Sequence, residues 1–274
     1  MAARYQLGFI GAGNMAEAIA AGVLRGGLMP AADMIASDPA DDRRRLFSER
    51  YAIATTADGR AVLADSARVL LAVKPQVLSE VMNALAGAWR PDHLIITILA
   101  GVAIDRIAQA TGCPQARIVR VMPNLPLAVG AGISAVVAGR GAGPEDVAFV
   151  RRLFETGGQT VVLDDESLLD AVTAVSGSGP AYFYYIVEAI EAAAAEAGLP
   201  APLARRLAEY ACLGAARMMV ESAEAPAELR RRVTSRGGTT QAAIEVMEAA
   251  GVSEAIRRAV LAAHRRAREL GGGA

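Results

Sequence analysis

The sequence predicts an α/β protein in which a doubly wound parallel sheet over residues 1–164 precedes an all-α domain over residues 165–274. Short, continuously apolar segments alternate with helix-like segments in the first part, which is typical of parallel strands covered on both faces. After Asp164 the strand signals stop, and Ala-rich helical segments bounded by Gly or Pro follow one another. The 274 residues are enough for two such domains.

The strands of the first domain are predicted from runs of Val, Ile and Leu. The first run is followed by a helix over residues 14–24, and the second by a helix over residues 41–50. This alternation implies the doubly wound order. The predicted strands span residues 6–10, 34–36, 69–73, 94–98, 118–122, 133–137 and 161–163.

The helices of the second domain are rich in Ala and poor in large apolar side chains. A domain of about 110 residues with this composition would have difficulty burying a sufficient core alone. Small side chains let helices of two chains approach closely, so we expect an interleaved homodimer. The predicted helices span residues 180–197, 201–220, 227–232, 241–249 and 254–270.

Charge and composition argue against several other classes of protein. A net charge of −1 and a pI near 6.2 leave no basic face for nucleic acid. The longest largely apolar run, residues 94–104, is about half of the roughly 20 residues that a membrane span needs. No basic leader precedes the first strand, so we expect a cytoplasmic protein. Two Cys and two His without a CxxC pair give no pattern for a metal site.

A glycine-rich turn, Gly11-Ala12-Gly13-Asn14-Met15-Ala16, follows the first strand. Gly11 permits the tight turn, and Gly13 lets the backbone approach a pyrophosphate. The free N–H groups at the start of the next helix suit an anion. Because the turn joins a buried strand to a helix at the start of a βαβ series, it predicts a dinucleotide site.

The end of the second strand, Ser37-Asp38, is where such folds meet the adenosine ribose. A carboxylate at Asp38 accepts hydrogen bonds from a free 2′-hydroxyl and repels a 2′-phosphate, which favours NAD(H). Ser37 and the run Arg43-Arg44-Arg45 favour NADP(H) instead. The plain structural alternative is that Asp38 caps the next helix and the arginines form a solvated face. The residues leave both cofactors open.

Lys74 is the one lysine among 28 basic residues. Lys74-Pro75 follows a buried strand, at the carboxyl edge where open α/β sheets bind ligands. A solvated turn is the alternative, but in a chain that otherwise uses Arg we expect Lys74 to serve the site. Ala100-Gly101 and Pro123-Asn124 follow the next strands along the same edge, where small residues leave room for a nicotinamide.

The segment 233–241, Val-Thr-Ser-Arg-Gly-Gly-Thr-Thr-Gln, is the most unusual part of the second domain. It combines hydroxyl side chains with a pair of glycines and opens the helix over residues 241–249. Free backbone N–H groups with Ser and Thr donors at a helix start suit a small carboxylate. A plain helix cap is the alternative, but one Ser or Thr would suffice for that.

Together these segments resemble pyrroline-5-carboxylate reductase, the enzyme of the last step of proline biosynthesis. The resemblance implies a Rossmann domain, an all-helical dimerisation domain, and dimers that can assemble into decamers. It implies an oxidoreductase acting on CH–NH groups, which takes hydride from NADPH or NADH and reduces L-1-pyrroline-5-carboxylate to L-proline. It covers nearly the whole chain and is carried by residues 8–16, 72–76, 100–102, 120–124, 176–182 and 233–240, the last being the family's signature.

The glycine turn, the strand ends and the resemblance together give the expected site. The cofactor would be bound by Gly11, Ala12, Gly13, Asn14, Met15, Ser37, Asp38, Ala72, Val73, Lys74, Pro75, Ala100, Gly101 and Asn124. The resemblance implies that the substrate carboxylate and ring nitrogen are held, across the dimer interface, by Ser235, Gly237, Gly238, Thr239 and Thr240. A protonated imine needs no strong general acid, so orientation supplies much of the rate. Thr240 is the candidate catalytic residue, as hydrogen-bond partner of the ring nitrogen.

The sequence departs from the family's pattern at two positions. Arg236 stands where the signature normally has Pro, which changes the rigidity and the charge of the loop. Asp38 stands where many relatives have a small or hydroxylated residue, which weakens the implied preference for NADPH.

Two other functions fit parts of the chain. A 3-hydroxyacid dehydrogenase-like oxidoreductase shares the opening turn and a helical second domain, but such enzymes typically use a lysine of the helical domain, and no lysine follows Lys74. A non-catalytic nucleotide-sensing module also fits the turn, but leaves the hydroxyl-rich segment 234–240 unexplained.

Overall fold

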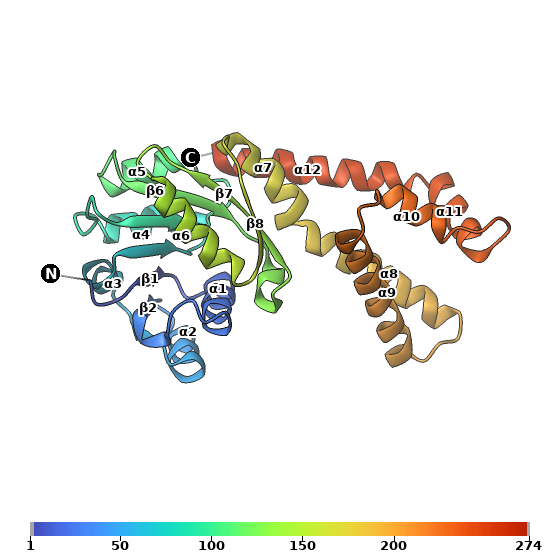
Figure 1. The fold of residues 1–274 in the computed structure, drawn as a ribbon, viewed down its shortest axis with the longest axis horizontal. Helices are drawn as coiled ribbons and strands as arrows, with labels where there is room; N and C mark the ends of the chain where they lie inside the picture. Colours follow the sequence, from blue (N-terminus) through green and yellow to red (C-terminus); the bar gives the residue numbers. More distant parts are fainter. Residues whose placement is uncertain (1–2, 273–274) are drawn as a thin grey trace. The chain divides into compact units, whose positions relative to one another are not determined.

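The computed structural model describes residues 3–272 and divides the chain into two compact units (Figure 1). The first consists of the chain up to Gly177 together with the residues from Ala263 onward, and the second of Ser178–Ala262. The first unit contains the sheet, and the second consists of helices and the turns that join them.

The sheet has eight strands in the order β3-β2-β1-β4-β5-β6-β7-β8. This order places the first strand centrally and reverses direction between β1 and β4, which is the arrangement of doubly wound dinucleotide-binding domains. The strands are β1 (Leu7–Ile10), β2 (Met34–Ser37), β3 (Ala54–Thr56), β4 (Arg68–Leu71), β5 (Leu94–Thr97), β6 (Arg117–Met122), β7 (Gly132–Ala138) and β8 (Gly158–Val162).

One strand departs from the predicted parallel arrangement. β7 runs antiparallel to β6, with Arg120 opposite Val137, whereas the other neighbouring pairs are parallel. The connection between β6 and β7 is short and contains only the 3₁₀ turn Leu125–Val129, and a parallel return would need a longer crossover. The predicted strands also did not include β3, a three-residue strand that is only partly buried at the edge of the sheet.

Helices cover both faces of the sheet (Figure 1). Side chains of successive strand residues alternate between two cores, so Phe9 lies in one and Ile10 in the other. The helices of this unit are α1 (Asn14–Arg25), α2 (Asp41–Arg45), α3 (Gly59–Asp65), α4 (Leu78–Ala84), α5 (Ile104–Thr111), α6 (Pro144–Glu155) and α7 (Leu169–Val172). α1 and α6 supply one core, and α3, α4, α5 and α7 the other.

The first unit extends past Asp164, where we predicted the domain boundary. Leu169 is fully buried in the core on one face of the sheet, and Glu166 pairs with Arg120 of β6 at 2.7 Å. Glu166 also accepts a hydrogen bond from the N–H of Ile104, the first residue of α5, at 2.8 Å. These contacts hold the chain beyond the last strand against the sheet.

The second unit is built from α8 (Gly179–Glu196), α9 (Ala201–Glu221), α10 (Pro226–Arg232), α11 (Thr239–Ala249) and the first part of α12 (Val252–Gly272). Its helices begin and end close to the predicted positions. Within Ser178–Ala262, Ala204 and Ala208 are the buried hydrophobic residues. Large apolar side chains such as Tyr185 and Val220 are 75% and 85% exposed. No helix within residues 3–272 is long and apolar enough to cross a membrane.

Candidate functional site

A cavity of about 440 Å³ lies at the carboxyl ends of β1, β2 and β4, at the point where the strand order reverses. Open α/β sheets bind ligands at this place. Part of its lining consists of residues predicted to bind the cofactor, namely Gly11, Gly13, Ser37, Asp38, Ala72, Val73 and Lys74. Sequence reasoning missed the remainder of the lining, which is largely apolar: Ile10, Pro39, Ala57, Gly59, Val77, Glu80, Val81, Ala84 and Leu85.

The two glycines of the turn meet different requirements, one of the fold and one of a ligand. Gly11 has a φ of +95°, and a Cβ there would lie 2.9 Å from the carbonyl oxygen of Ala72, so the fold itself requires glycine. Gly13 has a φ of −70° and a ψ of −179°, which any residue adopts, and a Cβ there would meet no atom within 4 Å. Because Gly13 lines the cavity, the space that its missing side chain leaves is available to a ligand.

The amino end of α1 faces the same turn. Gly13 is the N-cap residue of α1, and no side chain caps the helix. The first N–H groups of a helix have no partner inside it, and they attract anions. An uncapped helix start behind a glycine that leaves open space is the arrangement that a pyrophosphate requires.

Asp38 and Arg43 fix the glycine turn from two sides. The carboxylate of Asp38 accepts hydrogen bonds from the N–H of Ala12 at 2.8 Å and from the N–H of Ala40 at 3.0 Å. Nε of Arg43 donates to the carbonyl oxygen of Ala12 at 2.7 Å, and its Nη2 donates to Glu17 at 2.8 Å. Both backbone groups of Ala12 are therefore held by side chains from the segment that follows β2.

Lys74 follows β4 and lines the cavity, and the residue is exposed. The predicted strand over residues 69–73 ends earlier, at Leu71, so Ala72 and Val73 leave the sheet and line the cavity. Pro75 begins a 3₁₀ turn that leads into α4, whose residues Val81 and Ala84 form part of the apolar wall.

Other predicted cofactor residues lie outside the cavity lining, so their role stays a prediction: Ala12, Asn14, Met15, Pro75, Ala100, Gly101 and Asn124. Gly101 follows β5 with a φ of +72°, and a Cβ on it would lie 3.0 Å from the backbone nitrogen of Gly271. The amide of Asn124 donates to the carbonyl oxygen of Ser176 at 3.1 Å and accepts from the N–H of Ile133 at 3.0 Å. Each group keeps one further hydrogen-bonding position.

In the second unit, residues 235–238 form a tight turn before α11. The N–H of Gly238 donates to the carbonyl oxygen of Ser235 at 3.0 Å, and Gly237 has a φ of +72°. Within residues 3–272, Ala52 is the one non-glycine residue with positive φ, so Arg236 has negative φ. A negative φ followed by a positive one defines a type II β-turn, in which glycine is favoured at the third position and proline at the second.

The start of α11 leaves its hydroxyl side chains free for other contacts. Its N-cap residue is Gly238, no side chain caps it, and the N–H of Gly237 donates to Oε1 of Gln241 at 2.7 Å. Thr239 is exposed and Thr240 half-buried, and both belong to the first turn of the helix. An uncapped helix start with two adjacent threonines can bind a carboxylate. The role of residues 235–240 toward a substrate stays a prediction.

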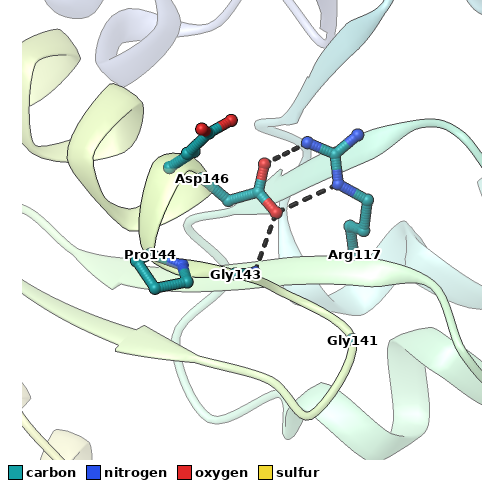
Figure 2. A pocket seen from close by; sticks show the side chains of 6 residues that line it. Arg117, Gly141, Gly143, Pro144 and Asp146 are labelled. Atoms are coloured by element: carbon teal, nitrogen blue, oxygen red, sulfur yellow. Dashed lines mark hydrogen bonds and ion pairs between the residues drawn. The ribbon is translucent and has the colours of Figure 1, made fainter.

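A larger but shallower depression of about 600 Å³ lies at the amino ends of the strands, near Arg117 (Figure 2). Figure 2 shows the side chain of Asp146 between Arg117 and the N–H of Gly143. Burial opposes ionisation of Asp146, but hydrogen bonds from Arg117 and Gly143 lower its pKa, and the same pair raises the pKa of Arg117. Both charges are satisfied by each other, so this ion pair holds β6 to α6 and offers no group to a ligand.

The fold and the first cavity define a class of protein. A doubly wound sheet with a glycine turn, an uncapped helix and a cavity at the reversal of strand order is a dinucleotide-binding domain, here joined to a helical unit. Residues 6–101 match the family described as NADP oxidoreductase coenzyme F420-dependent, and residues 166–270 match pyrroline-5-carboxylate reductase dimerisation. The second match implies a homo-oligomer.

The chain belongs to the pyrroline-5-carboxylate reductase family. It is 43% identical to the pyrroline-5-carboxylate reductase of Synechocystis over 267 residues, which cover 97% of this chain and 98% of that protein. The Pseudomonas aeruginosa protein of the same name is 41% identical, with 97% and 96% covered. A solved pyrroline-5-carboxylate reductase from Coxiella burnetii matches with a TM-score of 0.85 and 34% identity over 97% of this chain and 98% of that one. The resemblance inferred from the motifs is confirmed.

A solved pyrroline carboxylate reductase from Plasmodium falciparum, crystallised with NADP bound, matches with a TM-score of 0.88 over 99% of this chain and 100% of that one. At 24% identity it shows that the two chains share a fold.

Proposed function

We propose that this protein reduces the C=N bond of L-1-pyrroline-5-carboxylate to give L-proline, with NADPH or NADH as hydride donor. The observation that carries this proposal is the similarity to pyrroline-5-carboxylate reductases over almost the full chain, at 43% identity to the Synechocystis protein. Both parts of the chain contribute to it, because the matched residues include the glycine turn and the helical segment with the Ser235–Gly238 turn.

The cavity of the first unit fits a nicotinamide dinucleotide. Gly13 and the uncapped start of α1 suit the pyrophosphate, because a Cβ at Gly13 would occupy the cavity while nothing in the fold excludes it. The wall formed by Val77, Val81 and Leu85 is apolar and suits a planar base. When bound, the cofactor supplies the hydride. The residues that follow β4 and β5, such as Lys74 and Gly101, would hold the nicotinamide, as the sequence predicts.

The residues of the second unit would bind and orient the substrate. The turn Ser235–Gly238 and the free N–H groups at the start of α11 suit the carboxylate, and the hydroxyl of Thr240 suits the ring nitrogen. The reaction adds a hydride to C5 and leaves a proton on the nitrogen. Because the protonated imine forms in solution and is already electrophilic, orientation of the ring is the main task of the protein.

The helical unit would bury its apolar surface in a homodimer. Ala204 and Ala208 are its buried hydrophobic residues in the single chain, while large apolar side chains of α8, α9, α11 and α12 are exposed. Such a unit has too small a core to be stable alone. An isologous contact between two copies would cover this surface, and the substrate residues would then serve the site of the other subunit.

The reaction is tested by adding pyrroline-5-carboxylate to the purified protein and reduced nicotinamide cofactor. Loss of nicotinamide absorbance together with formation of proline supports the proposal. Oxidation of NADH or NADPH by a 3-oxo acid, with formation of the 3-hydroxyacid, would instead favour the dehydrogenase-like alternative. Nucleotide binding without turnover of any of these compounds would favour a sensing module.

A further inference from the structure

We propose that Asp38 makes this protein select NADH over NADPH. The inference rests on the proposed function in one respect, namely that a reduced nicotinamide dinucleotide occupies the cavity of the first unit. The two cofactors differ only by a phosphate on the 2′-oxygen of the adenosine ribose. The charges that line the cavity near the end of β2 therefore decide between them.

Asp38 is fixed in the position where a ribose hydroxyl meets the protein. It follows the last residue of β2, lines the cavity, and accepts from the N–H groups of Ala12 at 2.8 Å and Ala40 at 3.0 Å. Each carboxylate oxygen keeps one lone pair for a further donor. A free 2′-hydroxyl can donate to it, whereas a 2′-phosphate has no such donor and carries charge of the same sign.

Arg43 is held away from the cavity by two contacts. Its Nε donates to the carbonyl oxygen of Ala12 at 2.7 Å, and its Nη2 pairs with Glu17 at 2.8 Å. The side chain is mostly buried in these contacts and does not line the cavity. Turning it toward a phosphate would leave the Ala12 carbonyl and Glu17 without this donor.

Arg44 is engaged in a similar way, whereas Arg45 is exposed and makes one surface ion pair. Nη1 of Arg44 donates to the carbonyl oxygens of Asp38 and Pro39, both at 2.7 Å, and its Nη2 pairs with Asp41 at 3.1 Å. Nε of Arg45 pairs with the other oxygen of Asp41 at 2.8 Å. Neither side chain lines the cavity. The arginine run, which could have favoured NADP(H), stabilises the loop after β2 instead.

Lys74 is the cation that does line the cavity, but it lies at a different strand. β1 lies between β2 and β4, and neighbouring strands are about 4.8 Å apart, so the ends of β2 and β4 are separated by about 10 Å. Lys74 is thus placed toward the part of the cofactor that crosses β1 and β4. With Asp38 and Glu80 against Lys74, the charged side chains of the lining are two acidic and one basic.

The test is an equilibrium titration of the full-length protein with NADH and with NADPH, followed by nicotinamide fluorescence at low ionic strength. For the wild type we expect Kd for NADH to be lower by at least about tenfold, the effect of one carboxylate beside a doubly charged phosphate near a protein surface. Asp38→Asn keeps the shape and one acceptor, and should bring the two Kd values within about threefold. The matched control Asp42→Ser removes an exposed carboxylate that does not line the cavity, and should leave the ratio unchanged.

Lys74→Gln distinguishes the contribution of Lys74 to cofactor binding from that of Asp38. We expect it to weaken both cofactors by a similar factor. If Lys74→Gln weakened the binding of NADPH alone, the 2′-phosphate would lie at Lys74 and the proposal would be overturned. A wild-type preference for NADPH would also overturn it, as would an unchanged ratio of the two Kd values in Asp38→Asn. If the preference for NADH holds but pyrroline-5-carboxylate is not reduced, the reaction is wrong and the selectivity stands. If neither nucleotide binds, both the proposed selectivity and the proposed reaction are wrong.

Discussion

Gly13→Ala separates the needs of a ligand from the needs of the fold. The backbone of Gly13 is in an extended conformation open to any residue, and a Cβ there meets no atom within 4 Å. Alanine restricts the unfolded chain and so stabilises by about 0.4–1 kcal/mol. It is a poorer N-cap residue than glycine by an amount on the order of 0.5 kcal/mol. These effects oppose each other, so the melting temperature without ligand should change by less than about 3 °C.

Cofactor binding should respond quite differently. The methyl group that this substitution adds would occupy the cavity space between the turn and a pyrophosphate, at the uncapped start of α1. Loss of one hydrogen bond to a charged group costs about 1.5–3 kcal/mol. At about 1.4 kcal/mol per tenfold, Kd for NADH should rise by about 10- to 100-fold. Fluorescence titration measures the Kd, and a thermal melt without ligand measures the fold.

Gly143→Ala is the matched control for this prediction. Gly143 is the N-cap residue of α6, has an extended backbone, and would also carry a Cβ without clash, but it does not line the nucleotide cavity. It should leave both the melting temperature and the Kd nearly unchanged. A Kd within about twofold of wild type in Gly13→Ala would refute the assignment of this space to the pyrophosphate. Gly11→Ala should instead destabilise the fold itself, because of its φ of +95° and the 2.9 Å approach of a Cβ to the carbonyl oxygen of Ala72.

Three further predictions concern single residues. Burial and the nearby Arg90 lower the pKa of His93, whose neutral ring accepts from the N–H of Arg90 and contacts the carbonyl oxygen of Leu63. The neutral ring therefore stabilises the folded protein above about pH 6.5. This stabilisation is lost as pH falls from there toward the pKa of His93 in the folded protein, by up to about 1.4 kcal/mol per pH unit. Urea unfolding at several pH values should show this slope in wild type and a smaller one in His93→Gln; equal slopes would contradict it. Arg236→Pro should raise the unfolding free energy by about 0.4–1 kcal/mol in denaturant melts, because proline suits the second position of a type II turn; a decrease would mean that the turn differs. Thr240→Ala should lower kcat/KM for pyrroline-5-carboxylate about tenfold with Kd for NADH unchanged, and Thr240→Ser should restore most of it; unaltered kinetics would remove Thr240 from the site.

The sheet could be predicted largely from local sequence because three of its strands are fully buried and three more are mostly buried. β1 and β5 consist of continuous, fully buried residues, and both were predicted to within one residue at each end. β3 gave no such signal, because its three residues are partly buried at an edge. The reversed direction of β7 depends on the length of the connection before it, which apolar patterning alone does not specify.

The site could be predicted in part, for a similar reason. Gly11 and Asp38 carry signals at fixed offsets from a strand, whereas Val81 and Leu85 look like ordinary core residues of a helix and become cavity wall only through the packing of α4. The sequence also left the arginine run ambiguous. Its pairing with Ala12, Glu17 and Asp41 depends on three-dimensional contacts that no local pattern shows.

The most direct test of the proposed reaction is a stoichiometric turnover measurement. Purified protein is incubated with pyrroline-5-carboxylate and limiting NADH or NADPH, and both the oxidised cofactor and the amino-acid product are quantified. The proposed function predicts one proline formed for each cofactor oxidised, and no oxidation when the imine is omitted. Cofactor oxidation without proline, or no reaction with either nucleotide, would contradict it.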